Sequence, residues 1–376
     1  MPLLDPDPAG QPRRPPWRHL LQQCHVPLPS GDRGDELGEQ LPPCGRDGPA
    51  VEQVPGQDAH RRQRTLTGLT RHFLTGAELD RDELTGLLDR ALELKAAPYS
   101  SDVLARRAVA LIFQRPSTRT RVSFEAGIAE LGGHPMVLRT DDLQLTRGES
   151  IRDTAYVLSR HVAAIGIRTG PDELVEQLAE HSSVPVVNML TAGHHPCQAL
   201  ADLLTLRETF GRLDGLTVAY VGDGNNVARS LAQLGALAGV TVRIASPPSC
   251  ALDAPVADAL LTDDPRQAAA GADAIYTDVW VSMNDDPESA QTRRQALEPY
   301  RLDGELMGLA SPDAIALHCL PAHPGEEITE EVLYGPRQRI WDQAENRRHA
   351  QKALLELLVA PAGRSTPDPA SATLGM

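Results

Sequence analysis

Aromatic residues make up only 3% of the 376-residue sequence. The protein core must therefore be built from Ala, Leu, Val and Ile. The hydrophobic fraction of 41% still supplies enough apolar side chains for about two domains with cores of their own. This composition is typical of alternating strands and helices.

Positive charge is also scarce, since 36 Lys and Arg stand against 51 Asp and Glu and give a formal net charge of −15. An acidic chain repels phosphate groups at long range. The sequence therefore predicts no general nucleic-acid binding and no binding to anionic membranes. A small anionic substrate in a local cationic pocket remains allowed.

Cysteines are few and scattered, and they form neither a CxxC pair nor a Cys/His metal spacing. We therefore expect no metal site and a reduced, cytoplasmic compartment. No run approaches the roughly 18 apolar residues that a membrane span needs, and the N-terminus lacks the apolar core of a signal peptide. The five cysteines are Cys24, Cys44, Cys197, Cys250 and Cys319.

Both ends of the chain differ in composition from the middle. Residues 1–60 are rich in Pro, Gly and charge and show no periodicity, which predicts a disordered N-terminal tail without a catalytic part. Residues 361–376 predict a second, loose C-terminal tail in the same way.

Between these tails, short apolar runs alternate with helical patterns, which predicts βα repeats and parallel sheets. We expect an α/β protein of two domains, each a parallel β-sheet flanked by helices, with the active site in the cleft between them. One helix is predicted in residues 75–96, with Thr75 as N-cap. A long helix over 195–213, ending near Gly215, is predicted to connect the domains.

Each of six predicted strands ends in a polar cluster. Ligands bind outside the carboxyl ends of the strands in open parallel sheets, so these clusters predict one shared site. The runs are AVALIF before Gln114, VAAIGI before Arg168, VPVV before Asn188, LTVAYV before GDGNN (222–226), DAIYT before DVWVSM (278–283) and DAIAL before HCLP (318–321).

The first cluster, PSTRTR, brings hydroxyl and guanidinium groups together in residues 117–121. Pro116 ends the extended segment, and apolar residues from Val122 to Leu131 predict a helix after it. Ser117 to Thr120 would form its N-terminus, where free N–H groups and the helix dipole favour an anion. With Arg119 added, the motif predicts a phosphate site. The alternative is a capped helix with solvated arginines.

Three other features have competing interpretations. GDGNN suggests a dinucleotide site, but Val227 stands where the third glycine belongs, and the next strand ends without an acidic residue. A tight turn between strand and helix is the alternative, and an NAD-dependent enzyme is the least favoured function. His195 could cap a helix or lie in the core, and Cys319 could be a buried apolar cysteine.

Taken in order, the motifs STRTR, HPCQ, GDGNN, DVWVSM, HCLP and AENR resemble the aspartate/ornithine carbamoyltransferase family over roughly residues 66–360. HCLP and the DxxxSM pattern are similar to its ornithine branch. The resemblance implies that the carbamoyl group of carbamoyl phosphate passes to the δ-amino group of L-ornithine, giving L-citrulline and phosphate in arginine biosynthesis or catabolism. It also implies no cofactor and no metal.

The resemblance further implies a role for each matching position. Catalytic roles fall on Arg119, Arg168, His195, Gln198, Cys319 and Arg347. Carbamoyl phosphate would be held by Ser117, Thr118, Arg119, Thr120, Gln144, Arg168, His195, Gln198, Cys319, Leu320 and Arg347. Ornithine would be held by Asn188, Asp278, Ser282 and Met283.

Domains and assembly follow from the same resemblance. A carbamoyl-phosphate-binding domain would span residues 66–197, with a C-terminal helix at 343–360 packing back on it. An ornithine-binding domain would span 198–342. Gln144 matches a residue that the family lends to a neighbouring subunit, which implies a homotrimer with shared active sites.

Some positions depart from the family pattern. Gln114 and Arg115 stand where Glu-Lys is common, Asn284 replaces a glycine, Arg229 replaces a histidine, and Met189 and Ala192 are unusual. The segment between Pro247 and Thr262 looks short by one helix. Two alternatives therefore stay open: a carbamoyltransferase for another amine, such as an acylated ornithine or a diamine, and a catalytically weakened regulatory homologue.

Overall fold

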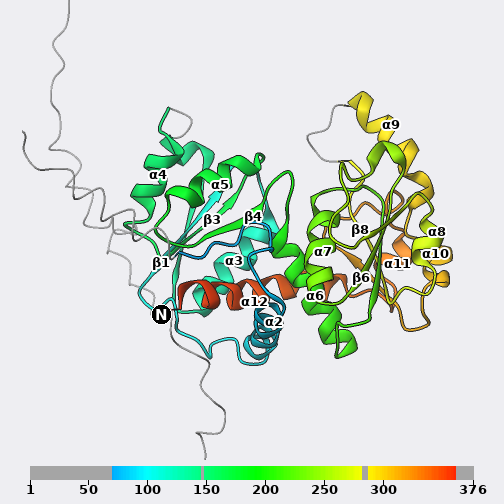
Figure 1. The fold of residues 1–376 in the computed structure, drawn as a ribbon, viewed down its shortest axis with the longest axis horizontal. Helices are drawn as coiled ribbons and strands as arrows, with labels where there is room; N and C mark the ends of the chain where they lie inside the picture. Colours follow the sequence, from blue (N-terminus) through cyan, green and yellow to red (C-terminus); the bar gives the residue numbers. More distant parts are fainter. Residues whose placement is uncertain (1–69, 145–147, 282–286, 361–376) are drawn as a thin grey trace, which may run out of the picture. The chain divides into compact units, whose positions relative to one another are not determined.

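The computed structural model describes residues 70–144, 148–281 and 287–360. Within them, two parallel sheets are each flanked by helices (Figure 1), which confirms the predicted fold class. The first sheet has the order β2-β1-β3-β4, with β1 Ala108–Phe113, β2 His134–Arg139, β3 Ala164–Arg168 and β4 Val186–Leu190. The second has the order β7-β6-β5-β8-β9, with β5 Thr217–Val221, β6 Thr241–Ala245, β7 Leu260–Thr262, β8 Ala274–Thr277 and β9 Ile315–His318.

Helices alternate with these strands along the chain, as βα repeats require. The 3₁₀ turns are η3 Thr140–Asp142, η5 Pro248–Cys250 and η6 Glu298–Tyr300. The α-helices are α2 Arg81–Ala96, α3 Thr118–Glu130, α4 Ile151–Leu158, α5 Asp172–His181, α6 Pro196–Phe210, α7 Asn226–Leu237, α8 Pro265–Ala269, α9 Pro287–Leu297, α10 Gly304–Leu309, α11 Glu330–Leu333 and α12 Ile340–Val359.

Strand registers place the carboxyl ends of neighbouring strands at one edge of each sheet. Phe113 pairs with Arg168 at the ends of β1 and β3, and Thr277 pairs with His318 at the ends of β8 and β9. The polar residues that follow neighbouring strands of one sheet therefore start side by side. The prediction for β4 was wrong in its end, because the strand continues through Asn188 to Leu190.

Two helix boundaries also differ from the predictions. The N-cap of α2 is Asp80 rather than Thr75, because Asp80 and Glu83 form a reciprocal capping box. Helix α6 ends at Phe210 rather than near Gly215, because Gly211 takes the left-handed conformation (φ 71°) that terminates helices. Between Pro247 and Thr262 the chain forms only η5 and β7, which agrees with the predicted short segment.

The last helix, α12, packs against α2, α3 and α6, far from it in sequence (Figure 1). It begins three residues before the predicted 343. Its buried Lys352 donates to Glu130 Oε2 and to the Pro98 carbonyl, both at 2.6 Å. A buried ammonium needs such partners, so these bonds fix the position of α12.

Two of the few aromatic side chains lie in contact at the centre of the core. Tyr220 on β5 and Tyr276 on β8 are fully buried, with ring centroids 5.4 Å apart. Within the described ranges, no helix is long and apolar enough to cross a membrane.

Candidate active site

The N-terminus of α3 forms directly after β1. Ser117 is its N-cap, and its hydroxyl accepts a hydrogen bond from the Thr120 amide over 3.3 Å. Thr118, Arg119 and Thr120 occupy the first turn, as predicted. Their side chains thus lie at a helix end whose amide groups favour an anion.

Arg119 and Arg347 connect this helix end to distant parts of the chain. Arg119 Nη2 donates to the Leu320 carbonyl over 2.5 Å. Arg347, on α12, donates through Nη2 to Thr120 Oγ1 over 3.2 Å and through Nη1 to Gln198 Oε1 over 2.5 Å. The first turn of α3 therefore contacts α12 and the turn after β9 directly, and it is linked to α6 through Arg347.

A third guanidinium, that of Arg168 at the end of β3, is repelled by the charges of Arg119 and Arg347. Burial, then the charges of Arg347 and Arg119, lower the pKa of Arg168 to about 10. It remains protonated at neutral pH, so three mutually repelling cations face one region. An anionic ligand would relieve that repulsion.

His195 precedes α6, and its amide donates to Ser230 Oγ over 2.8 Å. Burial lowers the pKa of its imidazole well below the usual value, and the cations Arg347, Arg168 and Arg119 add to this effect. The ring is therefore neutral at pH 7. His195 Nδ1 and Arg168 Nε are buried without a hydrogen-bond partner among the described residues. Such atoms are rare in folded proteins and suit a site that receives a polar ligand.

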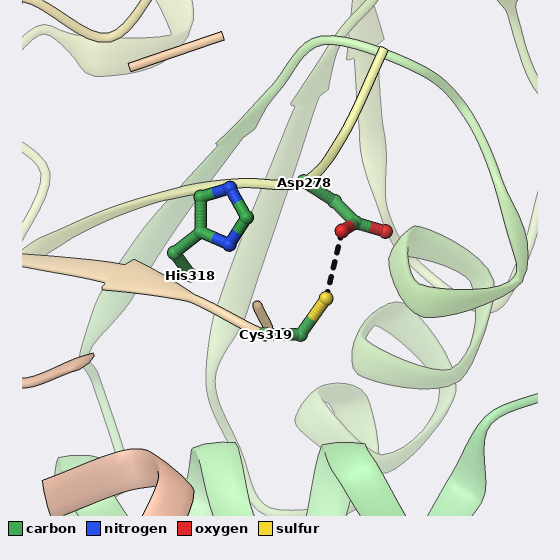
Figure 2. Close-up of side chains that lie close together, drawn as sticks. All are labelled: Asp278, His318 and Cys319. Atoms are coloured by element: carbon green, nitrogen blue, oxygen red, sulfur yellow. Dashed lines mark hydrogen bonds between the residues drawn. The ribbon is translucent and has the colours of Figure 1, made fainter. Parts of the chain in front are cut away.

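On the second sheet, Asp278 follows β8 and Cys319 follows β9. The Cys319 thiol donates to Asp278 Oδ1 over 2.8 Å, and Figure 2 shows the sulfur turned toward the carboxylate. Asn225 Nδ2 holds the other oxygen, Oδ2, at 2.9 Å. Burial and the neighbouring carboxylate raise the pKa of Cys319 well above its usual value. The side chain is thus a neutral thiol, which suits positioning rather than nucleophilic attack.

His318 lies beside this pair (Figure 2), and the ligand atoms of Asp278, His318 and Cys319 lie within 4.8 Å of one another. Its two ring nitrogens are already engaged: Nδ1 accepts from the Leu320 amide over 2.8 Å, and Nε2 donates to Glu327 Oε1 over 3.1 Å. A metal would have to displace one of these bonds. The arrangement therefore fits a fixed neutral histidine that shapes the turn, with Leu320 at φ 60°, better than a metal ligand.

The expected ornithine residues are only partly brought together. Asn188 lies in β4, where its Nδ2 donates to the Leu74 carbonyl (2.8 Å) and to Thr191 Oγ1 (3.1 Å), and its buried Oδ1 has no partner in the described residues. No described hydrogen bond joins Asn188 to Asp278. Ser282, Met283 and Asn284 lie outside the described residues. Gln144 is exposed and precedes the undescribed residues 145–147.

Sequence reasoning missed a buried polar group under the site. Asp202 Oδ1 accepts from Gln198 Nε2 (2.8 Å), Gln343 Nε2 (2.6 Å) and the Tyr276 hydroxyl (3.3 Å). Gln343 Oε1 in turn accepts from the His318 amide over 2.9 Å. The spacings were a usable signal, because Asp202 lies four residues after Gln198, on the same helix face, inside an apolar run.

Two models of known protein families match this chain. The model of the aspartate/ornithine carbamoyltransferase carbamoyl-P binding domain matches residues 71–208, and that of the Asp/Orn binding domain matches residues 214–358. The chain belongs to the aspartate/ornithine carbamoyltransferase family. The predicted family is thereby confirmed.

Individual members of the family are similar over nearly their whole length. The ornithine carbamoyltransferase of Parafrankia sp. is 52% identical over 305 residues, covering 77% of this chain and 96% of the relative. That of Acidothermus cellulolyticus is 52% identical over 308 residues, covering 78% and 98%. Among solved structures, the ornithine carbamoyltransferase of Pyrococcus furiosus matches with a TM-score of 0.74 at 44% identity, covering 77% and 97%. That of Thermus thermophilus matches with 0.70 at 46%, covering 76% and 97%.

Proposed function

We propose that this protein is an ornithine carbamoyltransferase, which converts carbamoyl phosphate and L-ornithine to L-citrulline and phosphate. The observation that carries the proposal is the pair of contacts made by the first turn of α3: Arg119 with the Leu320 carbonyl, and Thr120 with Arg347. The first contact joins this helix end to the turn that carries Cys319, and the second joins it to α12. The relatives named ornithine carbamoyltransferase support the same reaction.

The phosphate of carbamoyl phosphate would bind to Ser117, Thr118, Arg119 and Thr120, where amide groups and a guanidinium offset its charge. Gln198, Arg168 and His195 would surround the carbamoyl group. As the ornithine nitrogen attacks the carbonyl carbon, negative charge develops on the carbonyl oxygen. Arg119, Thr120, Arg168 and the neutral His195 supply donors for that oxygen.

The acceptor would lie against the second sheet. The Asp278 carboxylate suits the α-ammonium of ornithine, while the Cys319 thiol and the Leu320 carbonyl would orient the δ-amine. Once the C–N bond has formed, the C–O bond to phosphate breaks and the carbonyl is restored, and the amine proton leaves with the phosphate. Because both substrates are bound and aligned, much of the rate gain would come from orientation. Asn188, Ser282 and Met283 remain proposed contacts.

The enzyme is further proposed to act in the cytoplasm as a homotrimer in which Gln144 serves a neighbouring active site. Subunit mixing tests this assembly. If sites are shared, combining inactive Arg119→Ala subunits with inactive Gln144→Ala subunits restores part of the activity, because some sites receive both native residues. Activity that stays at the level of the separate variants contradicts sharing.

An assay for ureido products with a panel of amines tests the reaction. We expect turnover with L-ornithine and none with putrescine or N-acetylornithine. Turnover of either alternative instead assigns another acceptor, and phosphate binding without any turnover favours a regulatory homologue.

Arg119→Ala tests the anion site, because loss of its guanidinium should weaken carbamoyl phosphate binding by at least about 100-fold. Arg121→Ala is the matched control: it lies on the same helix but is half-exposed and paired with Glu125. Equal binding by the two variants contradicts the site.

A further inference from the structure

The buried carboxylate of Asp202 has no role in the substrate contacts above, and its partners come from two helices and from a strand of the second sheet. Its neighbours come from α6 (Gln198), α12 (Gln343) and β8 (Tyr276), and all three donate to the same oxygen, Oδ1. Asp202 is completely buried, and Oδ2 has no hydrogen-bond partner in the described ranges. Burying a carboxylate this way is unfavourable, so a function for it should be sought.

The chemistry of the donors fixes how the two glutamine amides are turned. A guanidinium only donates, so Arg347 must face the oxygen of Gln198; a backbone amide only donates, so His318 N must face the oxygen of Gln343. Both NH₂ groups then point at Asp202, which as a carboxylate only accepts. Turning either amide over would place NH₂ against a donor and oxygen against the carboxylate.

We propose that Asp202 is a positioning residue, whose carboxylate holds the Gln198 and Gln343 amides in the orientation that carbamoyl transfer needs. Through Gln198 it turns Oε1 toward Arg347 Nη1, and the second lone pair of that oxygen would accept from the carbamoyl NH₂. Through Gln343 it holds the His318 amide, and so the turn that carries Cys319 and Leu320. This inference rests on the proposed carbamoyl transfer and adds to it a residue that touches neither substrate.

The pKa of Asp202 agrees with such a role. Burial raises it to about 7, against the lowering effect of the Gln198 and Gln343 hydrogen bonds. Without those amide donors, the Tyr276 hydroxyl and the charge of Arg347, the pKa would lie higher still, so these groups keep a share of the side chain ionised at neutral pH.

The test compares Asp202→Leu, which removes the acceptor but keeps the branched shape, with Asp202→Asn, which keeps a weaker acceptor. We expect kcat to fall about 100-fold for Leu, the loss typical of small misplacements of reacting groups. For Asp202→Asn we expect kcat to fall about tenfold, since a neutral acceptor forms weaker hydrogen bonds than a carboxylate. Thr205→Val is the matched control, because it removes another buried contact between α6 and α12, the bond from Asn346 Nδ2.

A binding measurement separates this role from a loss of folding and from the reaction itself. Inorganic phosphate probes the helix end alone, whereas phosphonoacetamide, a stable analogue of carbamoyl phosphate, also carries the amide. Folded Asp202→Leu protein should bind phosphate within about twofold of wild type but phosphonoacetamide at least about fivefold more weakly, the value of one hydrogen bond.

The outcomes are distinct. If wild-type protein prefers phosphonoacetamide to phosphate but does not carbamoylate ornithine, the proposed function is contradicted. The role of Asp202 is then still decided by the ratio of the two binding affinities in the variants. The positioning role is overturned if Asp202→Leu or Asp202→Asn keeps both its preference for phosphonoacetamide over phosphate and its kcat within about threefold of wild type. It is also overturned if Thr205→Val lowers kcat as much as Asp202→Leu does, or if wild-type protein itself does not prefer phosphonoacetamide. Should Asp202→Leu not fold, Asp202→Asn decides.

Discussion

At the scale of single residues, the site combines strongly basic groups with side chains kept neutral. His195 loses its charge through burial among arginines, and Cys319 keeps its proton through burial beside Asp278. Neutral groups can position an amine or donate to an oxyanion without holding a permanent charge beside the carbamoyl carbon. These shifts in pKa can be tested without substrate.

Cys319 should react slowly with iodoacetamide in the native protein. Only thiolate reacts, and its pKa is raised, so at pH 7.5 we expect alkylation at least about tenfold slower than for an unhindered thiol. Peptide-resolved mass spectrometry measures the rate, with denatured protein as the reference. Asp278→Asn should accelerate it, because the neighbouring charge and hydrogen bond acceptor that raise the pKa are changed. Native alkylation as fast as the denatured rate contradicts the raised pKa.

At the scale of elements, strands were predicted better than helix ends. All six apolar runs form strands, because an apolar run bounded by turn residues has few alternatives. The start of α2 was misplaced because TGAE imitates a capping box. Instead, Glu78 accepts from the amides of Thr75 and Gly76 and closes a turn, and Gly76 takes φ 99°. The helix therefore begins only after Asp80.

Asp80→Ala measures the strength of this helix start. Loss of the capping box should lower the free energy of unfolding by about 1 kcal/mol, as for other N-caps. Urea denaturation gives the value. The matched control is Asp82→Ala, an exposed acidic residue in the same turn that caps nothing in the described contacts and should cost at most about 0.5 kcal/mol. An equal loss for both substitutions assigns the effect to the helix dipole instead.

At the scale of the whole molecule, the site was predicted as a set of residues but not as a connected structure. Arg119, Arg168 and His195 stood out as polar groups near strand ends, whereas Gln198 and Arg347 were named because they match the HPCQ and AENR motifs of the family. Asp202 and Gln343 were not named: the spacing of Asp202 from Gln198 places both on one helix face, but it does not tell which other elements pack against them. Their importance comes from burial against α6, α12 and β8 together, which no local pattern encodes. Ser282 and Met283 stay predictions.

Protonation of buried histidines should make the folded state less stable in mild acid. His349, on α12, has its pKa lowered mainly by burial. The unfolded imidazole binds a proton below about pH 6.5, whereas the folded one resists it, so stability is lost as pH falls through that value. Protonation of Asp202 has the opposite effect on stability as pH falls, because its raised pKa of about 7 means that the folded state binds this proton more readily than the unfolded state.

His349→Gln isolates one of these contributions. Between pH 7.5 and 5.5 the variant should lose up to about 1.4 kcal/mol less unfolding free energy than wild type, the linkage value for one histidine. Urea unfolding at both pH values measures the difference. Parallel pH dependence of the two proteins excludes a lowered pKa for His349.

The dependence of the site on α12 has a consequence for protein synthesis. Thr120 and Arg347 are hydrogen-bonded although 227 residues separate them. At about 5–20 residues per second, the ribosome needs roughly 10–45 s to cover that distance. During this time the first sheet can fold, but the turn proposed to bind phosphate lacks the arginine that α12 brings. A nascent or prematurely released chain therefore cannot consume carbamoyl phosphate, and activity begins only when translation has passed the final helix.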